Sequence, residues 1–161
     1  MLSILLDTNI LIDFYQRREP HVDYARQLML ASSFGDAELW VSAKSFADVF
    51  YVLSKRHPSS EVQAAFLESL GWLKVCSIDG PDVKLASERT WDDFEDCLVA
   101  IAAEKAGADF LITRDAAGFA DSRVPALSPQ AFFDHLAAEH GIVYETVDWD
   151  EDGRGDGREP R

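Results

Sequence analysis

Three aspartates stand where a predicted strand ends or a predicted helix begins, and a fourth lies in a helical run between them. Asp7 follows the first predicted strand and Asp115 follows the fourth. Asp96 lies in the first turns of a predicted helix, and Asp48 lies one to two turns into another. In an open α/β sheet, sites form outside the carboxyl ends of the strands. We therefore expect these four carboxylates to meet at that edge of the sheet.

Such a cluster of like charge needs a counter-charge. Two carboxylates about 4 Å apart repel by roughly 4 kcal/mol at an effective dielectric of 20. Three or four together would cost a sizeable part of a fold stability of about 5–15 kcal/mol. We expect Arg114 to be the only basic residue beside them. The natural partner is Mg²⁺ or Mn²⁺, which prefer oxygen ligands and promote phosphodiester hydrolysis. The predicted ligands are Asp7, Asp96 and Asp115, with Asp48 as a further catalytic acid.

Each of these acids also has a purely structural interpretation. Asp7 could be a turn residue or a helix cap and Asp115 a turn residue, because aspartate is favoured at both kinds of position. Asp96 could be the third residue of a capping box at the start of its helix. A lone buried carboxylate is costly, so Asp48 either faces outward or has a partner. The joint arrangement, rather than any single residue, favours the metal site.

Several neighbouring residues could support this chemistry. Asn9 and Thr113 could orient the acids or a water molecule, although both residue types also form turns. Asp93 lies on the same helix face as Asp96, so it is either an auxiliary ligand or a helix cap. Lys44 and Arg114 are candidates for contact with a phosphate. Trp91 and Phe94 lie close to Asp96 in sequence, where they either pack in the core or stack on a base.

Composition restricts the possible classes of protein. The chain has 161 residues and is 47% hydrophobic, which predicts one domain with its own core. Its net charge of -14 has the wrong sign for a protein that binds nucleic acid through lysine and arginine. Either the acids hold metal ions, or the partner is not nucleic acid, for example a basic protein. Cys76 and Cys97 are expected to be buried and free rather than joined in a disulfide.

The chain is expected to be cytoplasmic and not bound to a membrane. No apolar run approaches the roughly 18–20 residues of a membrane helix, and the start does not resemble a signal peptide. After about Tyr144 the chain becomes rich in glycine and aspartate, which predicts disorder. We therefore divide it into a folded domain at 1–140 and an acidic, disordered tail at 141–161.

Strand-like and helical runs alternate, which predicts an α/β fold with a mostly parallel sheet. The expected strands are 2–6, 39–41, 74–78, 110–113 and a short fifth at 124–127, and the expected helices are 9–15, 21–33, 42–56, 60–71, 81–89, 92–106 and 129–139.

Taken together, these motifs resemble the PIN domain, in particular the prokaryotic PIN-domain proteins that include VapC-like toxins. The resemblance covers about the first 138 residues. It rests on LLDTNILID at 5–13, DVFYVL at 48–53, DFEDCLVAIAAEKAGADFLITRD at 93–115, GF at 118–119 and VPALSPQAFF at 124–133.

The resemblance implies a three-layer α/β/α sandwich around a central, mostly parallel sheet of four to five strands. It also implies a ribonuclease that depends on Mg²⁺ or Mn²⁺, with its acids at Asp7, Asp48, Asp96 and Asp115. The second acid of the family is usually glutamate. Here Asp48 is one methylene shorter, which leaves direct contact with a metal and contact through a water both open.

The resemblance further implies partners. Many members of the family bind an antitoxin whose tail reaches into the acidic groove, and many form dimers. An alternative function is a catalytically weak PIN-fold protein that acts through protein contacts. A phosphotransferase with Asp7 as nucleophile would need an acid two residues later, where this chain has Asn9.

Overall fold

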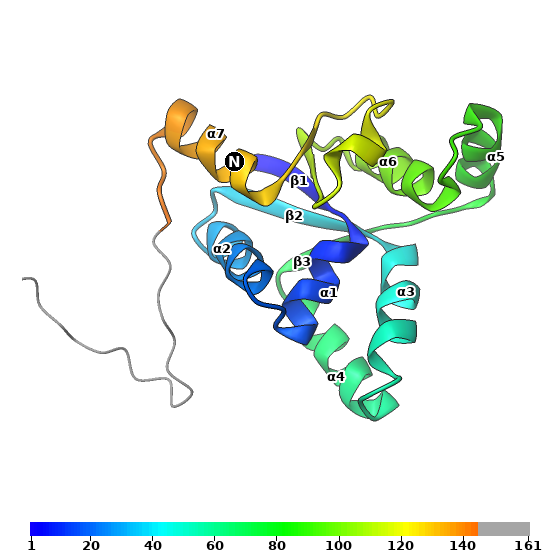
Figure 1. Cartoon of the computed structure of the whole chain (residues 1–161), viewed down its shortest axis with the longest axis horizontal. Coiled ribbons are helices and arrows are strands. Elements are labelled where there is room, and N and C mark those ends of the chain that lie inside the picture. Colours follow the sequence, from blue (N-terminus) through cyan, green and yellow to red (C-terminus); the bar gives the residue numbers. More distant parts are fainter. Residues whose placement is uncertain (145–161) are drawn as a thin grey trace, which may run out of the picture.

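The computed structural model describes residues 1–144, which form a five-stranded parallel sheet between two layers of helices (Figure 1). The strand order is β3-β2-β1-β4-β5, and every neighbouring pair is parallel. This confirms the predicted three-layer α/β/α architecture. The elements are β1 Leu2–Leu6, α1 Thr8–Gln16, α2 His21–Ser33, β2 Ala37–Ser42, α3 Ala43–Leu53, α4 Ser59–Ser69, β3 Leu73–Cys76, α5 Gly80–Arg89, α6 Phe94–Ala106, β4 Phe110–Ile112, the short 3₁₀ helix η1 Ala116–Phe119, β5 Ala126–Leu127 and α7 Pro129–His140.

The central strand β1 divides the core into two. Successive side chains of a strand point to opposite faces. Ile4 and Leu6 therefore pack on one face and Leu5 on the other, and all three are buried. A strand that is apolar on both faces is typical of a parallel sheet covered on both sides.

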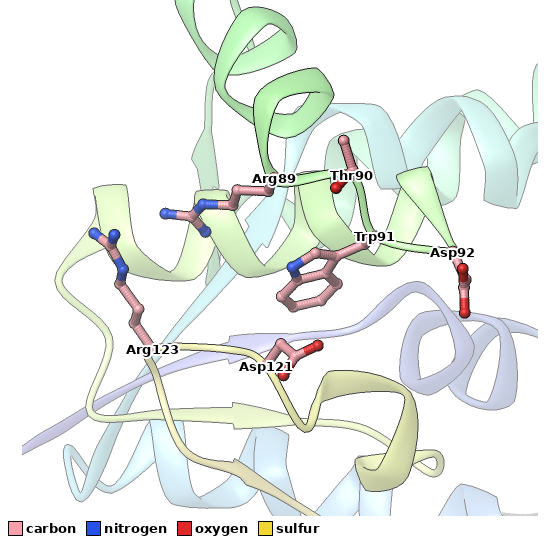
Figure 2. Close-up of a pocket in the computed structure, with 6 residues that line it drawn as sticks. All are labelled: Arg89, Thr90, Trp91, Asp92, Asp121 and Arg123. Carbon is pink, nitrogen blue, oxygen red and sulfur yellow. The ribbon is translucent and has the colours of Figure 1, made fainter.

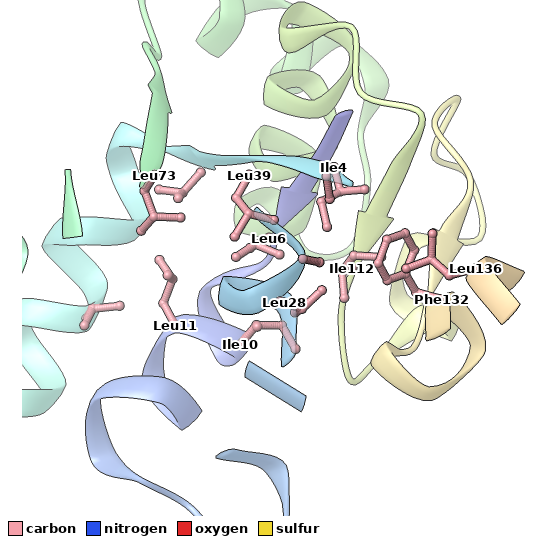
Figure 3. Close-up of a cluster of buried hydrophobic side chains, with 14 of the residues drawn as sticks. Ile4, Leu6, Ile10, Leu11, Leu28, Leu39, Leu73, Ile112, Phe132 and Leu136 are labelled. Carbon is pink, nitrogen blue, oxygen red and sulfur yellow. The ribbon is translucent and has the colours of Figure 1, made fainter. Parts of the chain in front are cut away.

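The larger core lies between the sheet and helices α1, α2, α3, α4 and α7. Figure 3 shows its side chains converging from the sheet and from these helices. The apolar residues of α2 recur at helical spacing, so that Val22, Ala25 and Leu28 are buried on one side. On α7, Phe132 and Leu136 pack against the same core.

Helix α6 covers the opposite face of the sheet, and α5 packs against α6. Every residue from Cys97 to Ala103 in α6 is buried. The alanines in this stretch allow the helix to lie close to the sheet. Gly107 ends the helix in the left-handed conformation, which glycine adopts without strain. The Cys76 and Cys97 thiols are free and buried, as predicted.

The sequence located the elements well but misplaced several ends. Strand β2 is longer than predicted, and β3 ends at Cys76 rather than at 78. Helix α3 ends at Leu53 rather than near 56, and β5 has only two residues. Both β3 and β5 are edge strands, where pairing on one side alone limits the length that the sequence pattern can indicate.

The last described residues still contact the fold. Ile142 and Tyr144 pack against the larger core, and the Tyr144 hydroxyl donates a hydrogen bond to Asp36. The remainder of the predicted tail, 145–161, lies outside the described residues, so its disorder stays a prediction. No helix within residues 1–144 is both long enough and apolar enough to cross a membrane.

Candidate active site

Asp7 lies where β1 passes into α1, at the carboxyl edge of the sheet. Its backbone N–H donates to the Ile112 carbonyl of β4 at 2.9 Å, which fixes the residue beside the end of the neighbouring strand. Its side chain caps α1 by accepting a hydrogen bond from the Thr8 N–H at 2.6 Å. The residue as a whole is only 6% exposed. Asp7 is therefore a helix cap, one of its two structural interpretations, but capping does not explain why this residue is buried.

Hydrogen bonds connect Asp7 to the next acid along the sheet edge. Asn9 Nδ2 and Thr113 Oγ1 each donate to Asp7 Oδ2 at 2.8 Å. The Thr113 hydroxyl also accepts from the Asp115 backbone N–H at 3.0 Å. Thr113 thus connects Asp7 to the turn that carries Asp115, and Asn9 and Thr113 both hold the Asp7 carboxylate.

Gly118 leaves room for two carboxylates. A Cβ atom at this position would lie 3.1 Å from Oδ2 of Asp96 and 3.1 Å from Oδ2 of Asp115. The two oxygens are therefore no more than twice that distance apart. The Gly118 N–H also donates to Asp115 Oδ1 at 3.2 Å, which caps η1. Sequence reasoning noted the Gly-Phe pair but assigned it no role, because its closeness to Asp96 depends on the tertiary fold.

The acids perturb one another electrostatically. Burial raises the pKa of Asp96 to about 6, with further contributions from the charges of Asp93, Asp7 and Asp115. Burial also raises the pKa of Asp7, and the charge of Asp115 adds to this, while hydrogen bonds from Thr113 and Thr8 oppose it. Asp7, Asp96 and Asp115 therefore share one region of space.

Asp93 caps α6, so one of its two expected roles is now visible. Its carboxylate accepts hydrogen bonds from the backbone N–H groups of Glu95 at 2.9 Å and Asp96 at 3.0 Å. Helix α6 consequently begins at Phe94 rather than at 92. The charge of Asp93 is, after burial, the largest contribution to the raised pKa of Asp96.

Asp48 forms an ion pair with Lys44, which the sequence had suggested only as a candidate for contact with a phosphate. Lys44 Nζ forms an ion pair with Asp48 and lies 3.5 Å from Glu95 Oε1, so it links α3 to the start of α6. The expectation that Arg114 alone is basic beside the acids is therefore wrong. The i, i+4 spacing of Lys44 and Asp48 was the available signal. Asp48 is not among the main charges that raise the pKa of Asp7 or Asp96.

The family profile of the PIN domain matches residues 3–117, which include the segments that carry Asp7, Asp48, Asp96 and Asp115. The chain belongs to the PIN domain family. This confirms the resemblance seen in the motifs. A comparison with curated protein sequences gives no match.

Solved structures share the PIN fold of this chain at low sequence identity. A chain of VapBC2 from Rickettsia felis, crystallised with a DNA fragment from its promoter, superposes with a TM-score of 0.60 at 18% identity, covering 79% of this chain and 98% of that one. A toxin-antitoxin complex from Klebsiella pneumoniae gives 0.57 at 23% identity, with coverages of 79% and 98%. VapC20 from Mycobacterium tuberculosis gives 0.55 at 18% identity, with coverages of 68% and 87%. These likenesses establish the fold.

Arg114 of this PIN domain forms an ion pair with a buried residue that sequence reasoning did not single out, and its charge also lowers the pKa of Asp7. Its Nε lies 2.8 Å from Oδ2 of Asp13, whose side chain is 1% exposed. Arg18 lies further away, at 3.9 Å from Asp13 Oδ1. Burial raises the pKa of Asp13, and the charge of Arg114 is the largest influence that lowers it. The Arg114 side chain is thus paired through Nε and is still 33% exposed.

The donor set fits a hard divalent cation. Asp7, Asp96 and Asp115 offer only carboxylate oxygens, the ligands that Mg²⁺ and Mn²⁺ prefer. The missing side chain at Gly118 keeps the space between two of these carboxylates open. Within residues 1–144, however, no three acidic, imidazole or thiol side chains are gathered closely enough to hold an ion as a set. The geometry is thus a close pair, Asp96 and Asp115, with Asp7 held beside them.

Proposed function

We propose that this PIN domain is a Mg²⁺- or Mn²⁺-dependent endoribonuclease that hydrolyses phosphodiester bonds in RNA. The observation that carries the proposal is the electrostatic coupling of Asp7, Asp96 and Asp115 at the carboxyl edge of the sheet, with Gly118 clearing the space between two of them. The family agrees with this, because PIN domain proteins are generally nucleases.

Some residues of the site would bind the ion, and others orient the carboxylates that bind it. Asp7, Asp96 and Asp115 would hold the ion, which when bound activates water and neutralises the non-bridging phosphate oxygens. Thr113 and Asn9 fix the Asp7 carboxylate, and the Gly118 N–H fixes that of Asp115. Such outer hydrogen bonds keep ligands in one orientation and commonly affect metal affinity by about 10–100-fold. Asp48 is proposed to act near the site from its ion pair with Lys44, rather than as a direct ligand.

We propose single-stranded or loop RNA as the substrate, because unpaired bases are accessible to side chains. VapC20, which shares the fold, is a toxin that cleaves the sarcin-ricin loop. We also propose that the protein is the toxin of a toxin-antitoxin pair, since two of the similar structures are toxin-antitoxin complexes. An adjacent reading frame that encodes a small DNA-binding protein would support this. A cytoplasmic location and a homodimer remain predictions.

Cleavage of a mixed RNA pool tests the activity. Wild-type protein with Mg²⁺ or Mn²⁺ is expected to cut the pool, and both EDTA and the Asp7→Asn substitution are expected to stop it, because each removes part of the metal site. The products would be followed on denaturing gels. Activity that survives both treatments would contradict the proposal.

Substitution of Gly118 tests the geometry of the acid pair. A Gly118→Ala variant is expected to fold normally but to bind Mn²⁺ roughly tenfold more weakly, because its Cβ displaces the carboxylates of Asp96 and Asp115. Isothermal titration measures the affinity. Gly80→Ala is the matched control, since a Cβ there meets nothing within 4 Å. Equal Mn²⁺ affinity in the two variants would show that Gly118 plays no part in the metal site.

The ion pair of Lys44 with Asp48 favours a second candidate function, a PIN-fold protein that is catalytically weak and acts through protein contacts. Substitution of Lys44 decides between the two. In an active enzyme, Lys44→Met is expected to strengthen Mn²⁺ binding by roughly tenfold, because it removes a nearby positive charge and releases Asp48. Lys55→Met, which removes an exposed lysine over the Tyr51 ring, serves as control. Absence of Mn²⁺ binding and of cleavage in wild type and Lys44→Met alike would favour the second function.

A further inference from the structure

A polar cavity of about 420 Å³ lies between the segment that joins α5 to α6 and the segment that precedes β5 (Figure 2). Arg89 and Arg123 lie at one end of it and Asp92 at the other, with the Trp91 indole and Asp121 between them. The lining residues are Arg89, Thr90, Trp91, Asp92, Asp121 and Arg123. We refer to it as the Trp91 pocket.

The Trp91 pocket is adjacent to the acids both along the chain and in space. The Trp91 ring packs edge-on against Phe119, with centroids 6.4 Å apart and an interplanar angle of 74°. Phe119 directly follows Gly118, which adjoins the carboxylates of both Asp96 and Asp115. A nucleotide next to one held at the acids would therefore reach this pocket.

Some charged groups of the pocket form no close ion pair with the rest of the described chain. Arg89 is fully engaged, because its two terminal nitrogens donate to Glu104 at 2.7 and 2.8 Å. Arg123 is different: its side chain is 75% exposed, and its only ion pair among residues 1–144 spans 3.8 Å to Glu104. In the same part of the chain, Asp92 and Asp121 form no ion pair. One arginine, two carboxylates and an aromatic ring are thus available to a ligand.

The net charge of the protein decides which part of RNA this pocket suits. At -14, the chain cannot gain much affinity from contacts with phosphates. Stacking on an aromatic ring is indifferent to charge and is a common means of binding single-stranded RNA. A carboxylate accepts hydrogen bonds from the N–H groups of a base, and an arginine donates to its acceptors. Guanine offers both, with donors at N1 and N2 and acceptors at O6 and N7.

We propose that the Trp91 pocket binds the base of a nucleotide adjacent to the cleaved bond and favours guanine there. The inference rests on the proposed function, because that function supplies the RNA. Trp91 stacks on the base, Asp121 accepts hydrogen bonds from its donor edge, and Arg123 donates to its acceptor edge. Trp91 also packs on Phe119, which agrees with the packing interpretation of this residue from the sequence, whereas its stacking on a base is the proposal made here.

Single-stranded RNA octamers that differ only at one central base test the proposal. Wild-type protein is expected to cut at least fivefold faster beside guanine than beside adenine, because adenine exchanges the donor and acceptor positions. Arg123→Gln and Asp121→Asn, both at exposed residues, are expected to reduce this preference to within about twofold. Arg56→Gln, at an exposed arginine outside the pocket, is the control and should keep it.

Binding without cleavage separates this inference from the proposed function. The Asp7→Asn protein in Mg²⁺ buffer is expected to bind the guanine octamer about tenfold more tightly than the adenine octamer, and a further Trp91→Leu substitution should remove the difference. Trp91→Phe keeps an aromatic ring against Phe119 and should retain part of it. Binding is also expected to depend only weakly on salt.

The possible outcomes differ clearly. Guanine binding without any cleavage would leave the pocket in place and overturn the ribonuclease. Cleavage whose base preference is unchanged in Arg123→Gln and Asp121→Asn would overturn the pocket and leave the ribonuclease. Failure to bind or cut either octamer would overturn both.

Discussion

An Asp96→Asn variant is expected to lose ribonuclease activity by roughly 100-fold or more and yet, without metal, to be more stable than the wild type. The activity falls because the amide is a poorer ligand for Mg²⁺ or Mn²⁺ than the carboxylate. The stability rises because the carboxylate is partly buried and lies near Asp93, Asp7 and Asp115, so its charge is unfavourable in the folded state. After allowance for its partial exposure, we expect a gain of about 1 kcal/mol, or about 2–4 °C in Tm.

The pH dependence of this gain has a definite sign. The pKa of Asp96 is raised from 3.8 to about 6 in the folded protein. The charge therefore destabilises the wild type fully above about pH 6 and not at all below about pH 4. The advantage of the asparagine variant should disappear as the pH falls through this interval. Thermal unfolding in EDTA between pH 4 and 8 measures it.

Metal ions should reverse the order of stability. Saturating Mn²⁺ stabilises whichever folded protein binds it, so the Tm of the wild type should rise and that of Asp96→Asn should not. Glu68→Gln removes one exposed negative charge on α4 and controls for net charge. If Asp96 served only the dipole of α6, its loss would instead destabilise the protein by about 0.5 kcal/mol at every pH above 4. That result would indicate that Asp96 has only a structural role at the start of α6.

The fold could be predicted from the sequence because its signals are local. The apolar run of β1 and its termination at Asp7 are both visible within ten residues, and the same holds for β4 and Asp115. Strand ends that share one edge of a parallel sheet place their flanking residues together without further information. The closeness of Asp7 and Asp115 therefore followed from topology alone.

The missing parts of the site depend on contacts between distant residues. Asp13 and Arg114 pair across about 100 positions of sequence, and nothing in either local pattern indicates the other. The space that Gly118 leaves for Asp96 likewise appears only when η1 packs against α6. Lys44 is the exception, because its spacing from Asp48 is local. Ion pairs between residues i and i+4 of one helix are common on protein surfaces. The spacing alone therefore does not indicate that such a pair belongs to a functional site.

Replacement of Arg114 is expected to have the largest effect on stability. Arg114→Met should destabilise the fold by about 3 kcal/mol, because it leaves the Asp13 carboxylate, 1% exposed, without its closest counter-charge. The more distant Arg18, at 3.9 Å, compensates only in part. Urea unfolding at pH 7 measures the loss. Arg26→Met breaks an exposed pair with Asp23 and should cost less than about 1 kcal/mol.

A second substitution distinguishes loss of the ion pair from loss of packing or of a substrate contact. Removing the carboxylate as well, in Asp13→Asn with Arg114→Met, should recover a large part of the stability, since no uncompensated charge then stays buried. If Arg114 instead binds a phosphate of the substrate, the single variant would unfold like the wild type and show only a raised KM for RNA. Because the guanidinium lies 2.8 Å from Asp13 in the folded protein, we expect the first result. The acids of the site would then depend on Arg114 indirectly, through the fixed position of the turn that joins Thr113 to Asp115.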